Sequence, residues 1–149
     1  MVLDGAIDLM NRIKAEFTYE VGATTAATTP PMSFALRRGV CQDFSHVMIS
    51  GLRALGLPAA YVSGHLRTGH LPGAVQLEGA DAMHAWVQVW CGEDAGWIGL
   101  DPTNGILAGD DHLELALGRD YADVAPLDGV IFASGGQNLE VSVQVVPVG

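Results

Sequence analysis

Residues 39–46 read GVCQDFSH and open the part of the chain that decides the fold. From Cys41 onward, apolar residues recur at every third or fourth position, which is the spacing of a helix with one buried face. That helix is expected to end at Gly56, because glycine readily takes the left-handed cap and Pro58 cannot continue a helix. The sequence therefore predicts that Cys41 lies in the first turn of a helix.

The segments around this helix predict the rest of the architecture. An earlier amphipathic helix is expected over residues 2–17, and residues 21–31, rich in Thr, Ala and Pro, are expected to form an extended surface loop. Beyond the helix the apolar period becomes that of strands, at 59–66, 86–90, 97–100 and 139–145, with a loop at 67–82 and a turn at 91–96. Residues 112–117 fit either a strand or one helical turn. Two helices followed by strands predict an α+β fold with an antiparallel sheet.

The composition favours one globular domain over residues 1–149, since 49% of the residues are hydrophobic and only 16% are charged. The net charge of −10 argues against nucleic acids and anionic membranes as partners, because both require basic surfaces. No apolar run approaches the length of a membrane span, and the first residues lack the pattern of a signal peptide. We therefore expect a cytoplasmic protein, of an oligomeric state that the sequence leaves open.

Cys41 is the candidate nucleophile. The thiolate is the reactive form of cysteine, and the free N–H groups and dipole of a helix N-terminus stabilise negative charge. The same N–H groups can stabilise the oxyanion that forms when sulfur attacks a carbonyl group. From this residue alone, the alternative is that Cys41 is simply a small buried residue of the helix.

The strands after the helix supply two further candidates, His84 and Asp101. If residues 91–96 form a hairpin turn, the numbers of two residues that face each other across the strands add up to 187, as those of Trp90 and Trp97 do. His84 then faces position 103. Asp101 is then a diagonal neighbour on the same face, within side-chain reach of His84. Such an aspartate can orient a histidine that takes the proton of a thiol. Taken singly, the histidine also fits a structural role and the aspartate a turn.

Zinc is the rival chemistry for these residue types. Cys41, Cys91, His84 and His46 include no pair at the close spacing that zinc sites usually show. We therefore expect no metal and no cofactor, a free structural thiol at Cys91, and a structural or surface role for His46.

Four segments, in order, resemble the core of the bacterial transglutaminase-like superfamily. They are GVCQDFSH at 39–46, LRALGLP at 52–58, HAWVQVW at 84–90 and WIGLDPT at 97–103. The resemblance covers about residues 3–104, and residues 118–126 also resemble bacterial members.

The resemblance implies a papain-like fold in which the nucleophile helix packs on an antiparallel sheet. It implies Cys41 as nucleophile, His84 as base and Asp101 as the residue that orients His84. The implied chemistry is attack on a carboxamide or amide bond of a protein or peptide, a thioester intermediate, and transfer to an amine or to water. Gln42 and Trp86 are expected to contact substrate because they neighbour the nucleophile and the base. The second oxyanion donor stays open.

The chain also departs from the family pattern. Bacterial relatives usually have Arg at the position of Ala60, often Tyr at that of His65, and a small residue at that of Met83. A substrate preference therefore cannot be carried over from them. Longer relatives carry an N-terminal β-rich region, and the alternative that this chain is a piece of a longer protein stays open. Hydrolysis is favoured over cross-linking because water is always available as acceptor. The rival function is a catalytically silent interaction domain on the same fold.

Overall fold

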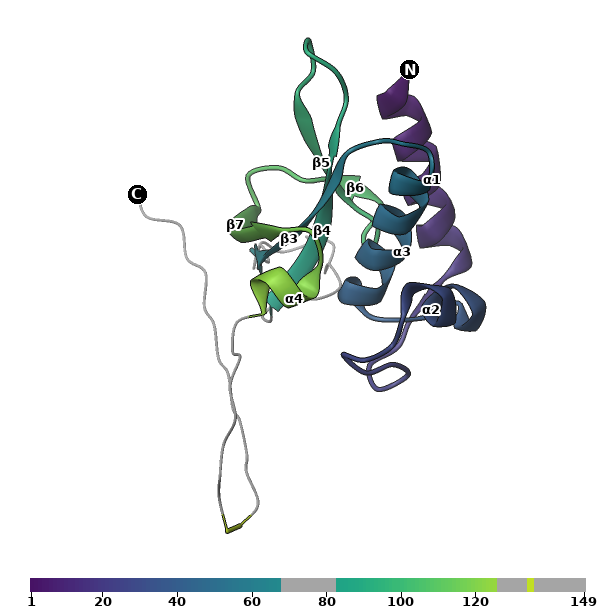
Figure 1. Cartoon of the computed structure of the whole chain (residues 1–149), viewed down its shortest axis with the longest axis vertical. Helices are drawn as coiled ribbons and strands as arrows, with labels where there is room; N and C mark the ends of the chain where they lie inside the picture. The colour runs from purple at the N-terminus through teal and green to yellow at the C-terminus, as the bar shows by residue number, and fades with distance from the viewer. Residues whose placement is uncertain (68–82, 126–133, 136–149) are drawn as a thin grey trace, which may run out of the picture.

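The computed structural model describes residues 1–67, 83–125 and 134–135 (Figure 1). The helices and strands are α1 (Val2–Glu16), β1 (Thr18–Tyr19), α2 (Pro30–Leu36), β2 (Arg38–Gly39), α3 (Cys41–Ala54), β3 (Ala59–Leu66), β4 (Met83–Trp90), β5 (Trp97–Asp101), β6 (Ile106–Leu107), β7 (His112–Gly118) and α4 (Tyr121–Val124). Within the described residues, no helix combines the length and apolar character that crossing a membrane requires.

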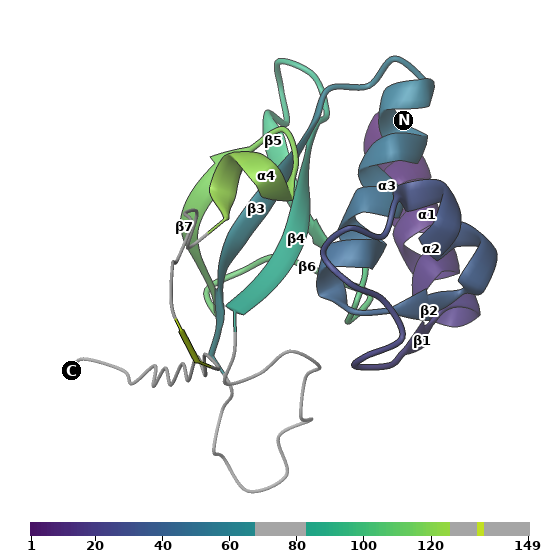
Figure 2. The ribbon, with the colours of Figure 1, turned by 60° about the horizontal axis from the view of Figure 1, so that its bottom comes forward.

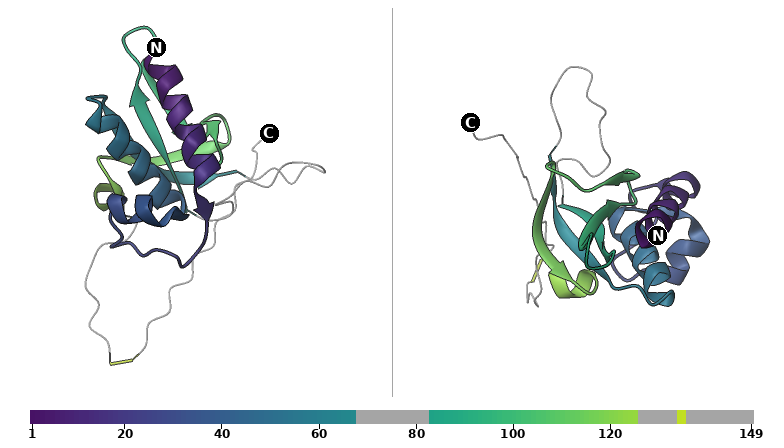
Figure 3. Two further views of the ribbon diagram at one scale, coloured as in Figure 1. Left: turned by 90° about the vertical axis from the view of Figure 1, so that its right-hand side faces the viewer. Right: turned by 90° about the horizontal axis from the view of Figure 1, so that it is seen from above.

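A curved antiparallel sheet is the centre of the fold. Its strand order is β6-β5-β4-β3-β7, and every neighbouring pair is antiparallel. The helices α1, α2 and α3 gather on one face of this sheet, while α4 lies beside the edge strand β7 (Figures 1 and 2). The view from above shows the sheet curving away from the three helices (Figure 3). The predicted α+β class with an antiparallel sheet is confirmed.

The core lies between α3 and the sheet. Residues of α3 at helical spacing are buried against alternate residues of β4, because a strand turns every second side chain to the same face. The buried apolar side chains include Phe44, Met48, Leu52, Tyr61, Val87, Val89 and Leu100. The helix α3, which begins with Cys41, therefore packs on the antiparallel sheet, as the family resemblance implied.

Several boundaries differ from the sequence-based expectation. The loop expected over residues 21–31 ends at Thr29, because α2 starts with Pro30 and Pro31. Proline lacks an N–H, but the first turn of a helix needs none there, so a Pro pair can open a helix as well as break one. β4 begins at Met83, three residues before the expected strand. Residues 112–117 form the strand β7, while the expected loop beyond Arg67 and the strand at 139–145 lie outside the described residues.

The start of α3 is fixed by the buried carboxylate of Asp43. It accepts hydrogen bonds from the backbone N–H of Val40 at 2.9 Å and from the hydroxyls of Thr24 at 2.6 Å and Ser33 at 2.8 Å. Gly39 permits this approach, since a Cβ there would lie 2.5 Å from Asp43 Oδ2. One side chain thus ties the first turn of α3 to the preceding loop and to α2.

Replacing Asp43 with alanine is expected to destabilise the fold by about 2–4 kcal/mol, because it leaves one buried and two partly buried donors without their acceptor. Urea denaturation measures the change. The matched control is Asp8→Ala, which removes an exposed carboxylate paired with Arg12 on the surface of α1 and should change stability little. Equal stability of the two variants would contradict the role of Asp43.

Candidate active site

The structure brings Cys41, His84 and Asp101 to one place from three different elements. Cys41 is the first residue of α3, His84 the second of β4 and Asp101 the last of β5. The hairpin register pairs Val87 with Leu100 and Trp90 with Trp97, so paired positions sum to 187. The predicted register is confirmed, and it makes Asp101 the diagonal neighbour of His84.

Asp101 is fully buried and accepts five hydrogen bonds. Its Oδ1 accepts from the backbone N–H groups of Thr103 at 3.0 Å and Asn104 at 3.1 Å. Its Oδ2 lies 2.8 Å from His84 Nε2, 2.8 Å from Asn104 Nδ2 and 3.1 Å from His112 Nε2. Both roles that the sequence allowed are present: one oxygen shapes the turn and the other holds the histidine.

The other ring nitrogen of His84, Nδ1, is left for Cys41. Nδ1 is buried and makes no hydrogen bond of standard geometry within the described part of the chain. The thiol of Cys41 is nevertheless close enough to His84 to stabilise the protonated ring. Because Nε2 is hydrogen-bonded to Asp101, we assign the interaction with Cys41 to Nδ1. A thiol–imidazole contact of loose geometry is common when no substrate is bound.

The electrostatics of the site favour an imidazolium at His84 beside a carboxylate at Asp101. Burial alone lowers the pKa of His84, but the hydrogen bond to Asp101, the nearby Cys41 thiol and the charges of both groups outweigh it and raise the pKa to about 9. Burial alone would raise the pKa of Asp101, but hydrogen bonds from His112, His84 and Asn104, with the charge on His84, hold it well below its usual range.

Two residues of this cluster, His112 and Asn104, were missed by the sequence analysis. Asn104 follows the Asp-Pro turn, where an aspartate that bonds nearby backbone N–H groups could have suggested it. His112 comes from β7, which pairs with β3 across a long stretch of chain and through a register shift between Ser63 and Gly64. No local pattern gives that pairing, so the sequence offered no way to place His112.

Trp86 and Gln42 lie near these residues in different ways. Trp86 is only 2% exposed, and its ring centroid lies 6.1 Å from that of His84 and 5.1 Å from that of His112. It therefore supports the histidines from within the protein, and its expected contact with substrate stays a prediction. Gln42 lines a groove of about 320 Å³ together with residues 26–30 and Tyr121. A larger hollow of about 640 Å³, among α1, α2 and α3, includes none of the three candidate residues.

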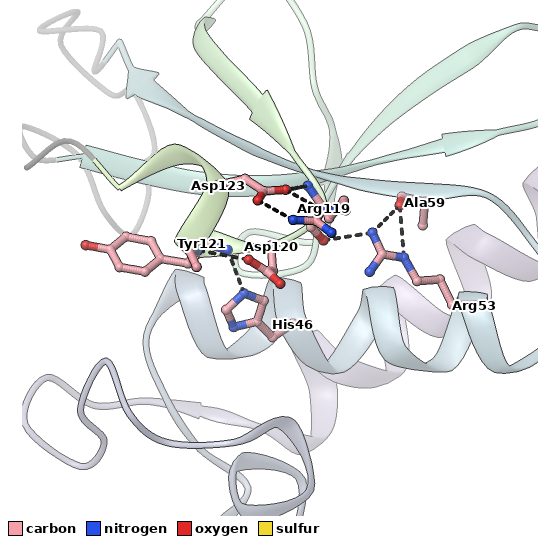
Figure 4. A network of polar contacts seen from close by, with 8 residues as sticks. His46, Arg53, Ala59, Arg119, Asp120, Tyr121 and Asp123 are labelled. Atoms are coloured by element: carbon pink, nitrogen blue, oxygen red, sulfur yellow. Dashed lines mark hydrogen bonds and ion pairs between the residues drawn. The ribbon is translucent and has the colours of Figure 1, made fainter. Parts of the chain in front are cut away.

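His46 has the structural role that the sequence analysis expected. Its Nε2 accepts a hydrogen bond from the backbone N–H of Tyr121 at 3.1 Å, and burial lowers its pKa, which keeps the ring neutral and able to accept (Figure 4). Further along α3, Arg53 donates to the carbonyl oxygens of Ala59 at 2.8 Å and Arg119 at 2.7 Å. The hydrogen bonds to Arg119 and Tyr121 connect α3 to the segment around the start of α4, and the one to Ala59 connects it to β3.

Three potential metal-binding side chains, His84, Asp101 and His112, lie together in the described part of the chain, with ligand atoms within 4.8 Å of one another. The hydrogen bonds above account for this arrangement, since each Nε2 is within hydrogen-bond distance of Asp101 Oδ2. Of the four residues that the sequence analysis considered as zinc ligands, His84 is the one that belongs to this group. The expectation of no metal stays a prediction.

A helix that begins at a cysteine, packed on an antiparallel sheet that presents a histidine and an aspartate beside it, is the arrangement of a papain-like fold. The comparison with protein families agrees: the model of the transglutaminase-like superfamily matches residues 2–102. The chain belongs to the transglutaminase-like superfamily.

Two bacterial proteins are among the relatives of this chain. The uncharacterized protein Rv2569c of Mycobacterium tuberculosis is 46% identical over 144 residues, which cover 94% of this chain and 46% of that protein. A protein-glutamine gamma-glutamyltransferase of Pseudomonas aeruginosa is 36% identical over 117 residues, covering 74% of this chain and 17% of that protein. The chain thus spans less than half the length of these relatives.

Solved structures share the fold. A cysteine protease candidate from Cytophaga hutchinsonii has a TM-score of 0.69 and 28% identity, covering 83% of this chain and 38% of that one. The periplasmic domain of TgpA from Pseudomonas aeruginosa has a TM-score of 0.53 and 28% identity, covering 70% of this chain and 38% of that one. Legionella pneumophila LapG, at 16% identity and a TM-score of 0.58, shares the fold alone, over 84% of this chain and 74% of that one.

The His84 environment predicts a pH-dependent stability. A histidine with an ordinary pKa of 6.5 when unfolded and about 9 when folded stabilises the protein fully below pH 6.5, and this contribution is lost as the pH rises to 9. The loss amounts to about 3 kcal/mol. Urea denaturation across this range should show it in the wild type and not in His84→Gln. Parallel pH profiles for the two proteins would contradict the assignment.

Proposed function

We propose that this chain is a cysteine-dependent acyl-transfer or hydrolytic domain that acts on carboxamide or peptide bonds through a thioester intermediate. The observation that carries the proposal is the hydrogen bond from His84 Nε2 to the buried Asp101, which leaves Nδ1 for the Cys41 thiol that raises the pKa of His84. Nucleophile, base and orienting residue form one chain of contacts, as covalent catalysis requires.

In the first half of the proposed reaction, the Cys41 thiolate attacks the carbonyl carbon of the substrate. A C–S bond forms, and the π electrons of the carbonyl move to its oxygen. The protonated His84 gives its Nδ1 proton to the departing nitrogen as the C–N bond breaks. Ammonia or an amine leaves, and the acyl group stays on Cys41 as a thioester. Backbone N–H groups in the first turn of α3 are the candidate donors to the oxyanion.

In the second half, His84 Nδ1 takes a proton from water or from an acceptor amine as that molecule attacks the thioester. The C–S bond breaks, the acyl product leaves, and the thiolate–imidazolium pair returns. Asp101 takes no proton in either half, because its five hydrogen bonds stabilise the carboxylate. It holds the Nε2 proton of His84 in place and so keeps Nδ1 for the chemistry.

The substrate we propose is a protein or peptide that offers a Gln- or Asn-type carboxamide or a peptide bond. The relatives support this class in broad terms, since one is named for transferring the gamma-glutamyl group of protein glutamine and another as a cysteine protease candidate. Hydrolysis is the simpler outcome, because water needs no dedicated acceptor site. Gln42, the neighbour of Cys41 in sequence, lines a groove that we propose holds part of an extended substrate, although Cys41 itself does not line it. We further propose action in the cytoplasm, where Cys41 stays reduced.

The rival proposal is a silent interaction domain, and one observation favours it: Cys41 is only 9% exposed. A nucleophile must be reached by its substrate, whereas a purely structural thiol need not be. The reactivity of Cys41 therefore separates the two proposals.

Iodoacetamide labelling, located by peptide mass mapping, makes this test with Cys91 as the internal control. Cys91 is the more exposed thiol, and burial raises its pKa, so it should react slowly below neutral pH. We expect Cys41 to react at least about 10-fold faster there despite its lower exposure, because an adjacent imidazolium stabilises its thiolate.

The His84→Ala variant should remove the advantage of Cys41 over Cys91 while leaving Cys91 labelling unchanged. A Cys41 that is inert, or whose rate does not depend on His84, would overturn the enzymatic proposal in favour of the interaction domain.

A further inference from the structure

His112 occupies a defined place in the cluster. Its side chain is 4% exposed, its Nδ1 accepts a hydrogen bond from the backbone N–H of Gly109 at 3.3 Å, and its ring meets the Trp86 ring edge-on at 5.1 Å. Because Nδ1 accepts, the proton of a neutral ring lies on Nε2. His112 therefore donates from Nε2 to Asp101 Oδ2.

Asp101 Oδ2 is thus shared between two histidines. His84 Nε2 lies 2.8 Å from this oxygen and His112 Nε2 lies 3.1 Å from it, while Asn104 Nδ2 donates to it at 2.8 Å. Each donor withdraws part of the negative charge on the oxygen. The oxygen then attracts the proton of His84 less strongly than it would with His84 as its sole side-chain donor.

We propose that His112 is a positioning residue that acts on His84 through Asp101, holding the carboxylate in place and taking up part of its charge. The consequence concerns the proton that His84 passes to the leaving group. A carboxylate bound by His84 alone would hold the imidazolium too firmly, and the acid partner of the reaction would weaken. His112 moderates that hold without touching substrate.

The groups that face His84 make the direction of the effect clear. They are Cys41 from α3, Asp101 from β5 and, across Asp101, His112 from β7. Whether His112 is neutral or protonated, its N–H next to Asp101 opposes the protonation of His84. Removing that N–H should therefore raise the pH at which His84 loses its proton.

Histidine imidazole NMR of the full chain, followed against pH, tests this inference. In His112→Phe, which keeps a ring against Trp86 but has no N–H, the titration midpoint of His84 should rise by about 0.5–1 pH unit. In His112→Gln, whose amide nitrogen stands the same number of bonds from the backbone as Nε2, the midpoint should stay near that of the wild type. If His112→Phe does not fold, His112→Leu is expected to give the same rise.

A midpoint that is unchanged or lowered in the ring and aliphatic variants would overturn the inference, because it would mean that His112 only packs or only anchors the carboxylate. A rise in His112→Gln equal to that in His112→Phe would also overturn it. The catalytic meaning of the inference rests on the proposed function, but the titration needs no substrate. A chain with the expected titration and an unreactive Cys41 would contradict the proposed function and leave the role of His112 standing.

Discussion

The buried carboxylate of Asp101 is the constraint on which the rest of the site depends. An ionised carboxylate without partners inside a protein is unfavourable by several kcal/mol, so a fold that buries one must surround it with donors. Here two donors come from the backbone that follows the residue, one from the side chain of Asn104 in the same turn, and two from histidine side chains on the strands β4 and β7. The hydrogen bonds that offset the cost of burying the Asp101 carboxylate also connect β4, β5 and β7 at one point.

That arrangement sets where protons can reside. Asp101 remains an anion, so the proton on His84 Nε2 has a fixed partner, and Nδ1 is the ring nitrogen that the proposed proton exchange with Cys41 would use. Trp86 lies within this region, and Gly64 lets it pack there, since a Cβ at Gly64 would lie 2.6 Å from the indole ring. The histidine and the aspartate thus stand on the sheet, while Cys41, the proposed nucleophile, stands at the start of a helix that Asp43 ties to the preceding chain.

The part of the site that could be predicted from the sequence is the part whose contacting residues lie close together along the chain. The hairpin of β4 and β5 is local, so its turn fixed the register and placed His84 beside Asp101 correctly. The start of α3 at Cys41 was also predictable, because helix starts and ends leave local marks. β7 meets β3 through a bulge and from far along the chain, so the place of His112 depended on the complete fold. The α2 helix was hidden because its two prolines indicate a loop as readily as a first turn.

The central proposal is that Cys41 and His84 act as a nucleophile–base pair held by Asp101, with the proton residing on His84. Its most direct test is the ultraviolet absorbance of the thiolate, taken as the difference between the wild type and Cys41→Ser at neutral pH. The account predicts a thiolate signal equal to one cysteine per chain, which disappears when His84→Ala is introduced into both proteins. No difference between the wild type and Cys41→Ser at neutral pH would contradict the claim.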